Sequence, residues 1–194
     1  MSGKTKVLAV ARKLFWKKGY KSTSMNDIAE AYGCKPGNIY NFFDSKEAIL
    51  FEVLLEEMDQ IIDPIKHLEQ DEDSSPLEQL RLIISSHVQL TLSYRRTSKS
   101  LFDVALDNLS PSKRKQIVAL RDTYERILRK VITRGIRAKC FPDIDPRLAG
   151  IMIASMIVRT RVWFHPKKGL SPDQIADFIF RFALHGLGGR EPSG

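Results

Sequence analysis

The sequence has few of the features that mark an enzyme or a secreted protein. It contains only two cysteines, Cys34 and Cys140, which lie far apart and form no CxxC pair. This usage excludes a disulfide framework and fits a reducing compartment. Its four histidines show no HExxH or other metal-ligand spacing, and neither GxSxG nor a P-loop is present. The glycine cluster at residues 186–189 follows a predicted helix and so is no dinucleotide loop. We expect no catalytic function, no metal and no cofactor.

Long uncharged apolar segments are also missing. The longest, residues 148–158, has eleven residues, whereas a membrane-spanning helix needs about 20. The apolar run from Val7 to Ala11 is interrupted by Arg12 and Lys13, and is too short for a secretory signal. We expect a soluble, cytoplasmic protein without a membrane partner.

Positive charge is present in excess, and it is unevenly distributed. The net charge is +8, and residues 1–50 contain nine Lys or Arg against four Asp or Glu. Residues 51–80 contain one against ten, and the remainder contains 21 against nine. A basic leading segment favours a polyanionic partner, most often nucleic acid, although a solvated basic surface has the same composition.

The hydrophobic pattern is helical throughout. Apolar residues recur at spacings of three and four, and alternation with period two is scarce, which predicts an all-α fold. There are about nine predicted helices, near 4–18, 24–31, 36–42, 45–66, 75–95, 98–107, 111–138, 146–164 and 172–187.

Several helix starts are marked by capping residues. The segments 24–27 and 44–47 have the form of capping boxes, in which Ser24 or Asp44 would cap the helix. Four later starts place proline at the first helical position behind a capping side chain, where its missing N–H costs nothing. These prolines are Pro76, Pro111, Pro146 and Pro172.

Residues 24–43 predict two short helices joined by a tight turn at Gly33. Ala29 permits close approach of the helices, and Met25, Ile28 and Ile39 supply apolar contacts. The second helix offers an amide for base edges, a cation for phosphate or guanine, and a phenol for phosphate. Because such a helix enters the major groove N-terminus first, residues 35–38 should reach deepest. The alternative is an ordinary αα-hairpin with a polar outer face. The predicted reading residues are Lys35, Gly37, Asn38, Tyr40 and Asn41.

The segment 5–55, which contains these two predicted helices, resembles the DNA-binding domain of the TetR family of bacterial regulators. The resemblance implies that Thr23 and Ser24 cap the second helix against the phosphate backbone, and that Lys46 binds phosphate. It also implies that Tyr40 and Asn41 bind phosphate or base. The matching residues are Ala11, Leu14, Phe15, Gly19, Tyr20, Thr23, Ser24, Met25, Asp27, Ile28, Ala29, Gly33, Asn38, Ile39, Tyr40, Phe43, Ser45, Lys46, Glu47 and Leu50.

One departure from many family members is Pro36-Gly37. Proline makes the start of the reading helix rigid, while Gly37 leaves room for backbone approach and offers no side chain to a base. Base discrimination should therefore depend chiefly on Lys35, Asn38 and Asn41.

The expected organisation is a helix-turn-helix domain at residues 1–46 and a larger ligand-binding and dimerisation domain at 47–194. The resemblance assigns the last two helices to dimerisation, and both have broad apolar faces. A plain intramolecular core would look similar. The predicted dimerisation residues are Ile151, Ser155, Ile175, Phe178 and Phe182.

The middle helices combine apolar side chains with polar tips, as effector pockets do. The segment 109–163 also resembles, less extensively, regulators of fatty-acid or sterol catabolism that respond to acyl-CoA esters. The predicted effector residues are His87, Tyr94, Leu101, Phe102, Tyr124, Leu128, Met156 and Arg159. A cationic cluster either receives the phosphates of such a ligand or forms exposed helix faces. Its members are Arg126, Arg129, Lys130, Arg134, Arg137, Lys139, Arg159 and Arg161.

These features predict a homodimeric transcriptional regulator, acting as a repressor, that binds palindromic double-stranded operator DNA. A small apolar effector, of which acyl-CoA is one candidate, should release it. An aromatic or drug-like effector is the alternative. A sequence-independent architectural DNA-binding protein is a further alternative, although it would not need a large second domain.

Overall fold

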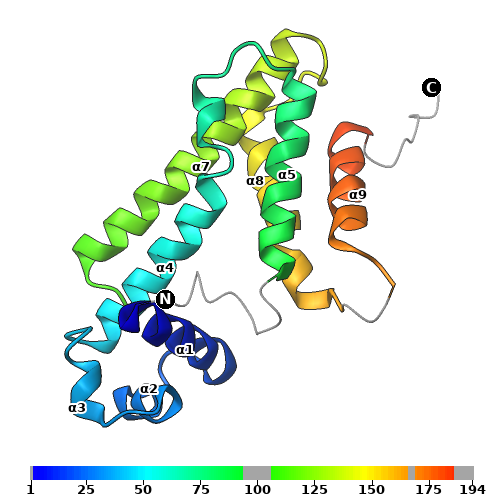
Figure 1. Cartoon of the computed structure of the whole chain (residues 1–194). Coiled ribbons are helices and arrows are strands. Elements are labelled where there is room, and N and C mark those ends of the chain that lie inside the picture. The colour runs from blue at the N-terminus through cyan, green and yellow to red at the C-terminus, as the bar shows by residue number, and fades with distance from the viewer. Residues whose placement is uncertain (1, 94–105, 166–168, 186–194) are drawn as a thin grey trace. The chain divides into compact units, whose positions relative to one another are not determined.

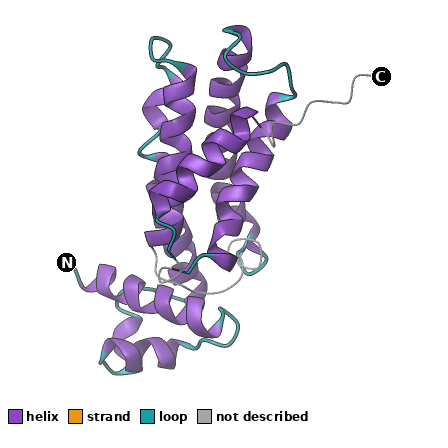
Figure 2. Cartoon of the chain, turned by 90° about the vertical axis from the view of Figure 1, so that its right-hand side faces the viewer, coloured by secondary structure: helices purple, strands orange, loops and turns teal. Residues whose placement is uncertain are grey.

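The computed structural model describes residues 2–93, 106–165 and 169–185. Within these ranges every regular element is a helix (Figure 2), which confirms the all-α prediction. None of the described helices has the length and hydropathy needed to cross a membrane. The elements, labelled in Figure 1, are α1 (Gly3–Lys18), α2 (Met25–Tyr32), α3 (Pro36–Ile39), α4 (Lys46–Ile62), the 3₁₀ helix η1 (Lys66–Glu69), α5 (Pro76–Ser93), α7 (Pro111–Arg137), α8 (Pro146–Trp163) and α9 (Pro172–His185).

The chain divides into two compact units. The first contains Met1–Asp59 and Thr97–Leu120, and the second contains Gln60–Arg96 and Arg121–Gly194. Helices α4 and α7 each contribute residues to both units. The division into domains at residues 1–46 and 47–194 stays a prediction.

The predicted helix starts are largely confirmed because they depend on local capping. Helices α5, α7, α8 and α9 begin at the four predicted prolines. The capping box that begins at Ser24 is present. The second predicted capping box is wrong. The cap lies one residue later, because the Ala48 N–H donates to the hydroxyl of Ser45 at 3.1 Å and not to the side chain of Asp44. Glu47 does not complete a box, because its carboxylate accepts a bond from the backbone N–H of Ser110 at 2.9 Å.

Two helices are shorter than expected, each for a physical reason. Helix α4 ends at Ile62 and not near 66, because Pro64 disfavours the helical conformation at the residue before it. Helix α3 ends at Ile39 and not at 42. It includes Gly37, which is a poor helix former and weakens so short a helix. The helix expected at 98–107 lies almost wholly outside the described residues.

In the second unit, α5 packs against α8 and α9 (Figure 1). Its buried face includes Ile83, Ile84 and Val88, and α9 contributes Ile179 and Phe180. These helices therefore share one apolar core.

The acidic segment at residues 69–74 is held on α7 of the same unit by three cations that are spaced four residues apart. Arg134 makes the most bonds, to main-chain carbonyls of the segment and to the side chain of Gln79 in α5. The contacts are Arg126 Nε to Glu69 Oε1 (2.7 Å), Lys130 Nζ to Glu69 O (2.7 Å) and Glu72 Oε1 (3.1 Å), and Arg134 to Asp71 O (2.8 Å), Glu72 O (2.5 Å), Ser74 O (3.1 Å) and Gln79 Oε1 (2.7 Å).

Candidate nucleic-acid interface

The start of α2 is held by a reciprocal capping arrangement. The Ser24 hydroxyl accepts from the Asp27 N–H at 3.1 Å, and the Asp27 carboxylate accepts from the Ser24 N–H at 2.7 Å. Hydrogen bonds from the Ser24 hydroxyl and N–H, and then from Lys18, hold the pKa of Asp27 well below its usual range. Ser24 is exposed. The remaining amides of the first turn of α2 have no intrahelical partner, which suits them to an anion such as a phosphate.

The turn between α2 and α3 depends on Gly33. Gly33 has a φ of 83° and a ψ of 36°, in the left-handed region, and its N–H reaches the carbonyls of Ala29 and Glu30. Glycine adopts this conformation without the strain that a Cβ would add. On the inner side, Ile28, Ala29 and Ile39 are completely buried. Of the three residues predicted to supply apolar contacts, Ile28 and Ile39 are therefore in the core, whereas Met25 is half-buried.

The outer face of α3 and the turn that follows it is polar. All five predicted reading residues are exposed, whereas Ile39 between them is buried. Lys35 is the N-cap of α3 but makes no side-chain capping bond. The exposed residues are Lys35, Gly37, Asn38, Tyr40 and Asn41.

The resemblance implies that Thr23 caps α2 together with Ser24, but the side chain of Thr23 makes no bond to the first turn of α2 and Ser24 alone is the N-cap. Thr23 is 1% exposed, and its hydroxyl donates to the carbonyl of Gly19 at 2.9 Å. Sequence pattern could not separate this buried threonine from its exposed neighbour Ser24. The hydroxyl of Thr23 stabilises the turn between α1 and α2.

Lys46 begins α4 and is half-buried. Its ammonium donates to the carbonyls of Tyr20 and Thr23, at 3.0 and 2.7 Å. It also lies 4.4 Å from the centre of the Tyr20 ring. Contact between Lys46 and phosphate stays a prediction.

The predicted dimerisation residues do not all lie on one face. Ile151, Ser155, Phe178 and Phe182 are exposed, and the Phe178 side chain has 68% of its surface accessible. Ile175 is only 4% exposed in the single chain. Because Ile175 lies on the inner face of α9, with Ala176, Ile179 and Phe180, it contributes to the core and offers no surface to a partner.

Helices α8 and α9 expose several large apolar side chains. Besides the residues already named, they include side chains of α8 that a monomer would leave in water. These are Leu148, Met152, Val158, Val162 and Trp163. A group of exposed large apolar side chains of this kind is typical of an interaction site.

Two of the predicted effector residues form a buried pair. His87 Nδ1 and the Tyr124 hydroxyl are 2.8 Å apart. Burial, and then the charge of Arg161, lowers the pKa of His87 to about 3, so its ring is neutral at physiological pH. Burial also raises the pKa of Tyr124. One turn further along α5, the hydroxyl of Thr91 is buried and has no hydrogen-bond partner among the described residues. Thr91 is not among the predicted effector residues, although its spacing of four from His87 places both residues on one helix face.

The other predicted effector residues that the structure describes differ in their burial. Leu128 is buried, Met156 is half-buried and Arg159 is exposed. Tyr94, Leu101 and Phe102 lie outside the described residues.

Some cations of the predicted cluster are bonded to other parts of the chain. Arg126, Lys130 and Arg134 hold the segment 69–74, as described above, while Arg129 is exposed. Arg161 lowers the pKa of His87 through its charge. The pattern of positive charge alone could not indicate which cations bind within the chain.

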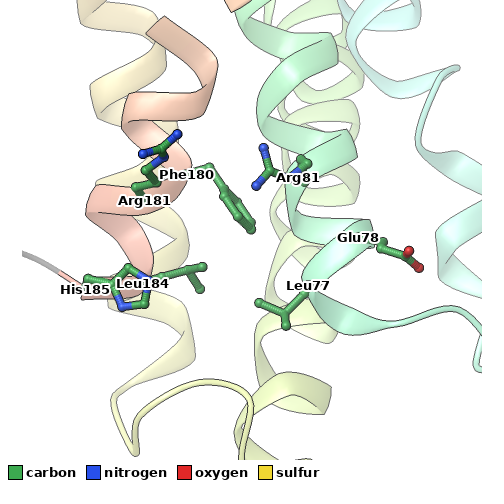
Figure 3. Close-up of a pocket in the computed structure, with 7 residues that line it drawn as sticks. All are labelled: Leu77, Glu78, Arg81, Phe180, Arg181, Leu184 and His185. Carbon is green, nitrogen blue, oxygen red and sulfur yellow. The ribbon is translucent and has the colours of Figure 1, made fainter. Parts of the chain in front are cut away.

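A pocket of about 540 Å³ lies between α5 and α9 (Figure 3). Leu77 and Leu184 face each other across it, and Arg81 lies over the Phe180 ring at 4.1 Å. Arg81 is also 3.0 Å from Asp177. None of the predicted effector residues lines this pocket.

Two short helices joined at a left-handed glycine, with a buried apolar side and an exposed polar second helix, define a helix-turn-helix protein of the kind that reads DNA. A family model described as "Bacterial regulatory proteins, tetR family" matches residues 7–53. A second, described as "Tetracyclin repressor-like, C-terminal domain", matches residues 73–187. The chain belongs to the TetR family of transcriptional regulators.

Individual relatives agree with this assignment. The HTH-type transcriptional repressor KstR2 of Rhodococcus jostii is 24% identical over 186 residues, which cover 95% of this chain and 90% of that protein. The solved structure of the TetR-family regulator PfmR of Thermus thermophilus is 31% identical, with a TM-score of 0.81, and the match covers 93% of this chain and 98% of PfmR. AibR, solved in complex with isovaleryl coenzyme A and operator DNA, is 22% identical with a TM-score of 0.81, over 93% of this chain and 97% of AibR. The likeness to AibR shows the fold alone.

Proposed function

We propose that this chain is a homodimeric repressor that binds an inverted-repeat operator through α2 and α3. The observation that carries this proposal is the exposed polar face of α3 on a scaffold whose apolar residues are buried. Lys35, Asn38 and Asn41 supply the cation and the amides that discriminate bases in the major groove. The exposed Ser24 and Tyr40 would add contacts to phosphate.

The test is to select the preferred operator from random duplexes and to compare variants on it at fixed salt. We expect Asn38→Ala to cost about 1–3 kcal/mol and to relax the choice at one base position in each half-site. Gln116→Ala, which removes an exposed amide from α7, is the control and should bind like the wild type. A wild-type protein without preference among duplexes, or an Asn38→Ala variant with intact preference, would contradict the proposal.

Dimerisation is supported by the exposed apolar side chains of α8 and α9. A single short helix contacts few bases, so helix-turn-helix proteins commonly bind two half-sites as dimers. We expect Phe178→Glu to yield monomers in sedimentation and to reduce operator affinity strongly. Leu82→Glu, which adds the same charge at an exposed position of α5, should stay dimeric. If Phe178→Glu also stayed dimeric and bound normally, the interface would lie elsewhere.

For the effector, we infer that the larger domain binds a small, mainly apolar molecule, and that an acyl-CoA is the first class to test. The support is the bound isovaleryl coenzyme A of AibR and the weaker resemblance of the segment 109–163. The neutral His87–Tyr124 pair, with Thr91 nearby on α5, suits an uncharged carbonyl such as that of a thioester. Each buried methylene of the acyl chain would contribute about 0.8 kcal/mol.

The effector test uses an operator-bound sample titrated with isovaleryl-CoA, a long-chain acyl-CoA, free coenzyme A and the free acids. Release by a thioester, but not by coenzyme A or by the acid, would support the inference. Release only by an aromatic or drug-like compound would contradict it and would leave the DNA-binding proposal intact.

A further inference from the structure

We propose that the hydroxyl of Thr91 is the hydrogen-bond donor that binds an uncharged acyl carbonyl of the effector. This inference rests on the proposed effector binding in the larger unit. It assigns the recognition of the carbonyl to one residue, beside the pair that His87 and Tyr124 already form with each other.

Thr91 is a buried polar residue whose hydrogen-bonding capacity is unused. It is 2% exposed, and its hydroxyl has no partner among the described residues. A hydroxyl carries one O–H donor, and burying that donor without an acceptor costs free energy that a valine of similar shape would not cost. An unpaired buried group of this kind is accounted for if a ligand supplies the acceptor.

The other buried threonines in the described part of the chain use their hydroxyls within the protein. The Thr23 hydroxyl donates to Gly19 O at 2.9 Å, and the Thr160 hydroxyl donates to Ile157 O at 2.6 Å. A threonine within a helix can make such a bond to a carbonyl of the preceding turn. Thr91 lies within α5 but makes no such bond. Its hydroxyl is therefore available to a ligand, whereas the other two are not.

The position of Thr91 places its side chain next to a neutral polar pair. Thr91 follows His87 by four residues, so both side chains lie on one face of α5, with their Cβ atoms about 6 Å apart. His87 Nδ1 is 2.8 Å from the Tyr124 hydroxyl of α7, so this face of α5 is directed towards α7. Burial lowers the pKa of His87 to about 3, and the pair is therefore uncharged at physiological pH.

An uncharged carbonyl fits these surroundings better than a carboxylate does. Val88 on α5 and Leu128, one turn after Tyr124 on α7, are buried apolar residues. Burying an anion among apolar groups is costly unless a cation pairs with it. The charge of Arg161 on α8 reaches His87, but Arg161 is only half-buried and has another interaction within the protein. The free acid is therefore the informative competitor of an acyl carbonyl.

The experiment uses the full chain without DNA and low-molecular-mass probes, so it needs neither an operator nor coenzyme A. The probes are the S-ethyl thioester of isovaleric acid, ethyl isopentyl sulfide, which lacks only the carbonyl oxygen, and isovalerate. In NMR titrations we expect the wild type to bind the thioester about tenfold more tightly than the sulfide, and isovalerate more weakly than the thioester. Thr91→Val should bind the thioester and the sulfide alike, and Thr91→Ser, which keeps the hydroxyl, should retain the preference.

Thermal unfolding without any probe tests the unpaired hydroxyl by itself. We expect Thr91→Val to raise Tm by about 2–4 °C, because it removes a buried hydroxyl that has no acceptor. The matched control is Thr160→Val, which removes a hydroxyl that is bonded to Ile157. This control should not raise Tm, and it should keep the wild-type preference for the thioester.

A Tm of Thr91→Val equal to or below that of the wild type would overturn the proposal, because the hydroxyl would then have a partner in the protein. Equal affinities of the wild type for the thioester and the sulfide, tighter binding of isovalerate than of the thioester, or no binding of any probe would also overturn it. If acyl-CoA released no operator while the preference for the thioester depended on Thr91, the proposed effector would fail and the role of Thr91 would stand.

Discussion

Replacing Gly37 by alanine separates what the free protein needs from what a DNA complex needs. Gly37 is not among the glycines with positive φ, which are Gly19, Gly33 and Gly169 in the described part of the chain. A Cβ built on Gly37 meets no heavy atom within 4 Å. Nothing within the described chain therefore requires glycine at this position.

The free protein should gain stability from Gly37→Ala. Alanine is more favourable than glycine in a helix interior by about 1 kcal/mol, and α3 is short, so this is an upper bound. For a chain of this size the gain corresponds to a rise in Tm of at most about 2–4 °C. Thermal unfolding of the variant and the wild type, without DNA, measures it.

The operator complex should lose affinity in the same variant. If α3 enters the groove N-terminus first, a methyl group at residue 37 occupies the space between the helix backbone and the DNA. We expect binding weaker by about tenfold, or about 1.4 kcal/mol, in fluorescence anisotropy at matched salt. The control is Gly150→Ala, whose added Cβ would meet Leu128 at an ordinary 3.6 Å and should leave operator affinity unchanged. A Gly37→Ala variant that bound as tightly as the wild type would refute close approach at α3.

Three further predictions concern the larger unit. Gly135→Ala should destabilise the protein by about 1–3 kcal/mol, because its Cβ would lie 2.0 Å from the Phe141 ring; equal denaturant midpoints for Gly135→Ala and the wild type would contradict this. Arg134→Ala should cost about 2–4 kcal/mol in urea unfolding, since it removes four hydrogen bonds from a charged donor, and Arg134→Lys should restore only part of this, because an ammonium has three donors. His87 is protonated more readily in the unfolded state, where its pKa is about 6.5. Its burial, with a folded pKa of about 3, should reduce stability by about 1.4 kcal/mol for each pH unit as the pH falls from about 6.5 to about 3, and His87→Phe should remove that part of the slope.

The sequence predicts the fold well where the signals are local. A proline behind a capping residue marks a helix start without reference to any distant residue, and α5, α7, α8 and α9 all begin at such prolines. Gly33 likewise terminates α2 in the left-handed conformation that the turn needs. The position of α3 and the exposure of its polar residues follow from these local features.

The roles that sequence analysis could not predict depend on tertiary partners. Thr23 and Ser24 are adjacent hydroxyl residues, yet one is buried in a turn and the other caps a helix. Ile175 and Phe178 are both large and apolar on one helix, and they differ only in which side of α9 faces the core. The residue types alone do not indicate which of the two side chains faces the core, because this depends on which side of α9 packs against the other helices.

The partners of charged residues are the hardest to predict from the sequence, because the sequence does not reveal whether a cation binds another part of the chain or a ligand. The cations of α7 suggest a site for ligand phosphates, but Arg126, Lys130 and Arg134 are bonded to the acidic segment that precedes α5. An effector with phosphates would have to compete with those contacts or use other cations, such as the exposed Arg129 or Arg159. The neutral His87–Tyr124 pair is not bonded to the acidic segment, so a ligand that binds it would not compete with those ion pairs. If the proposed effector binds in the interior of this unit, an uncharged polar group would therefore suit the His87–Tyr124 pair better than a phosphate would.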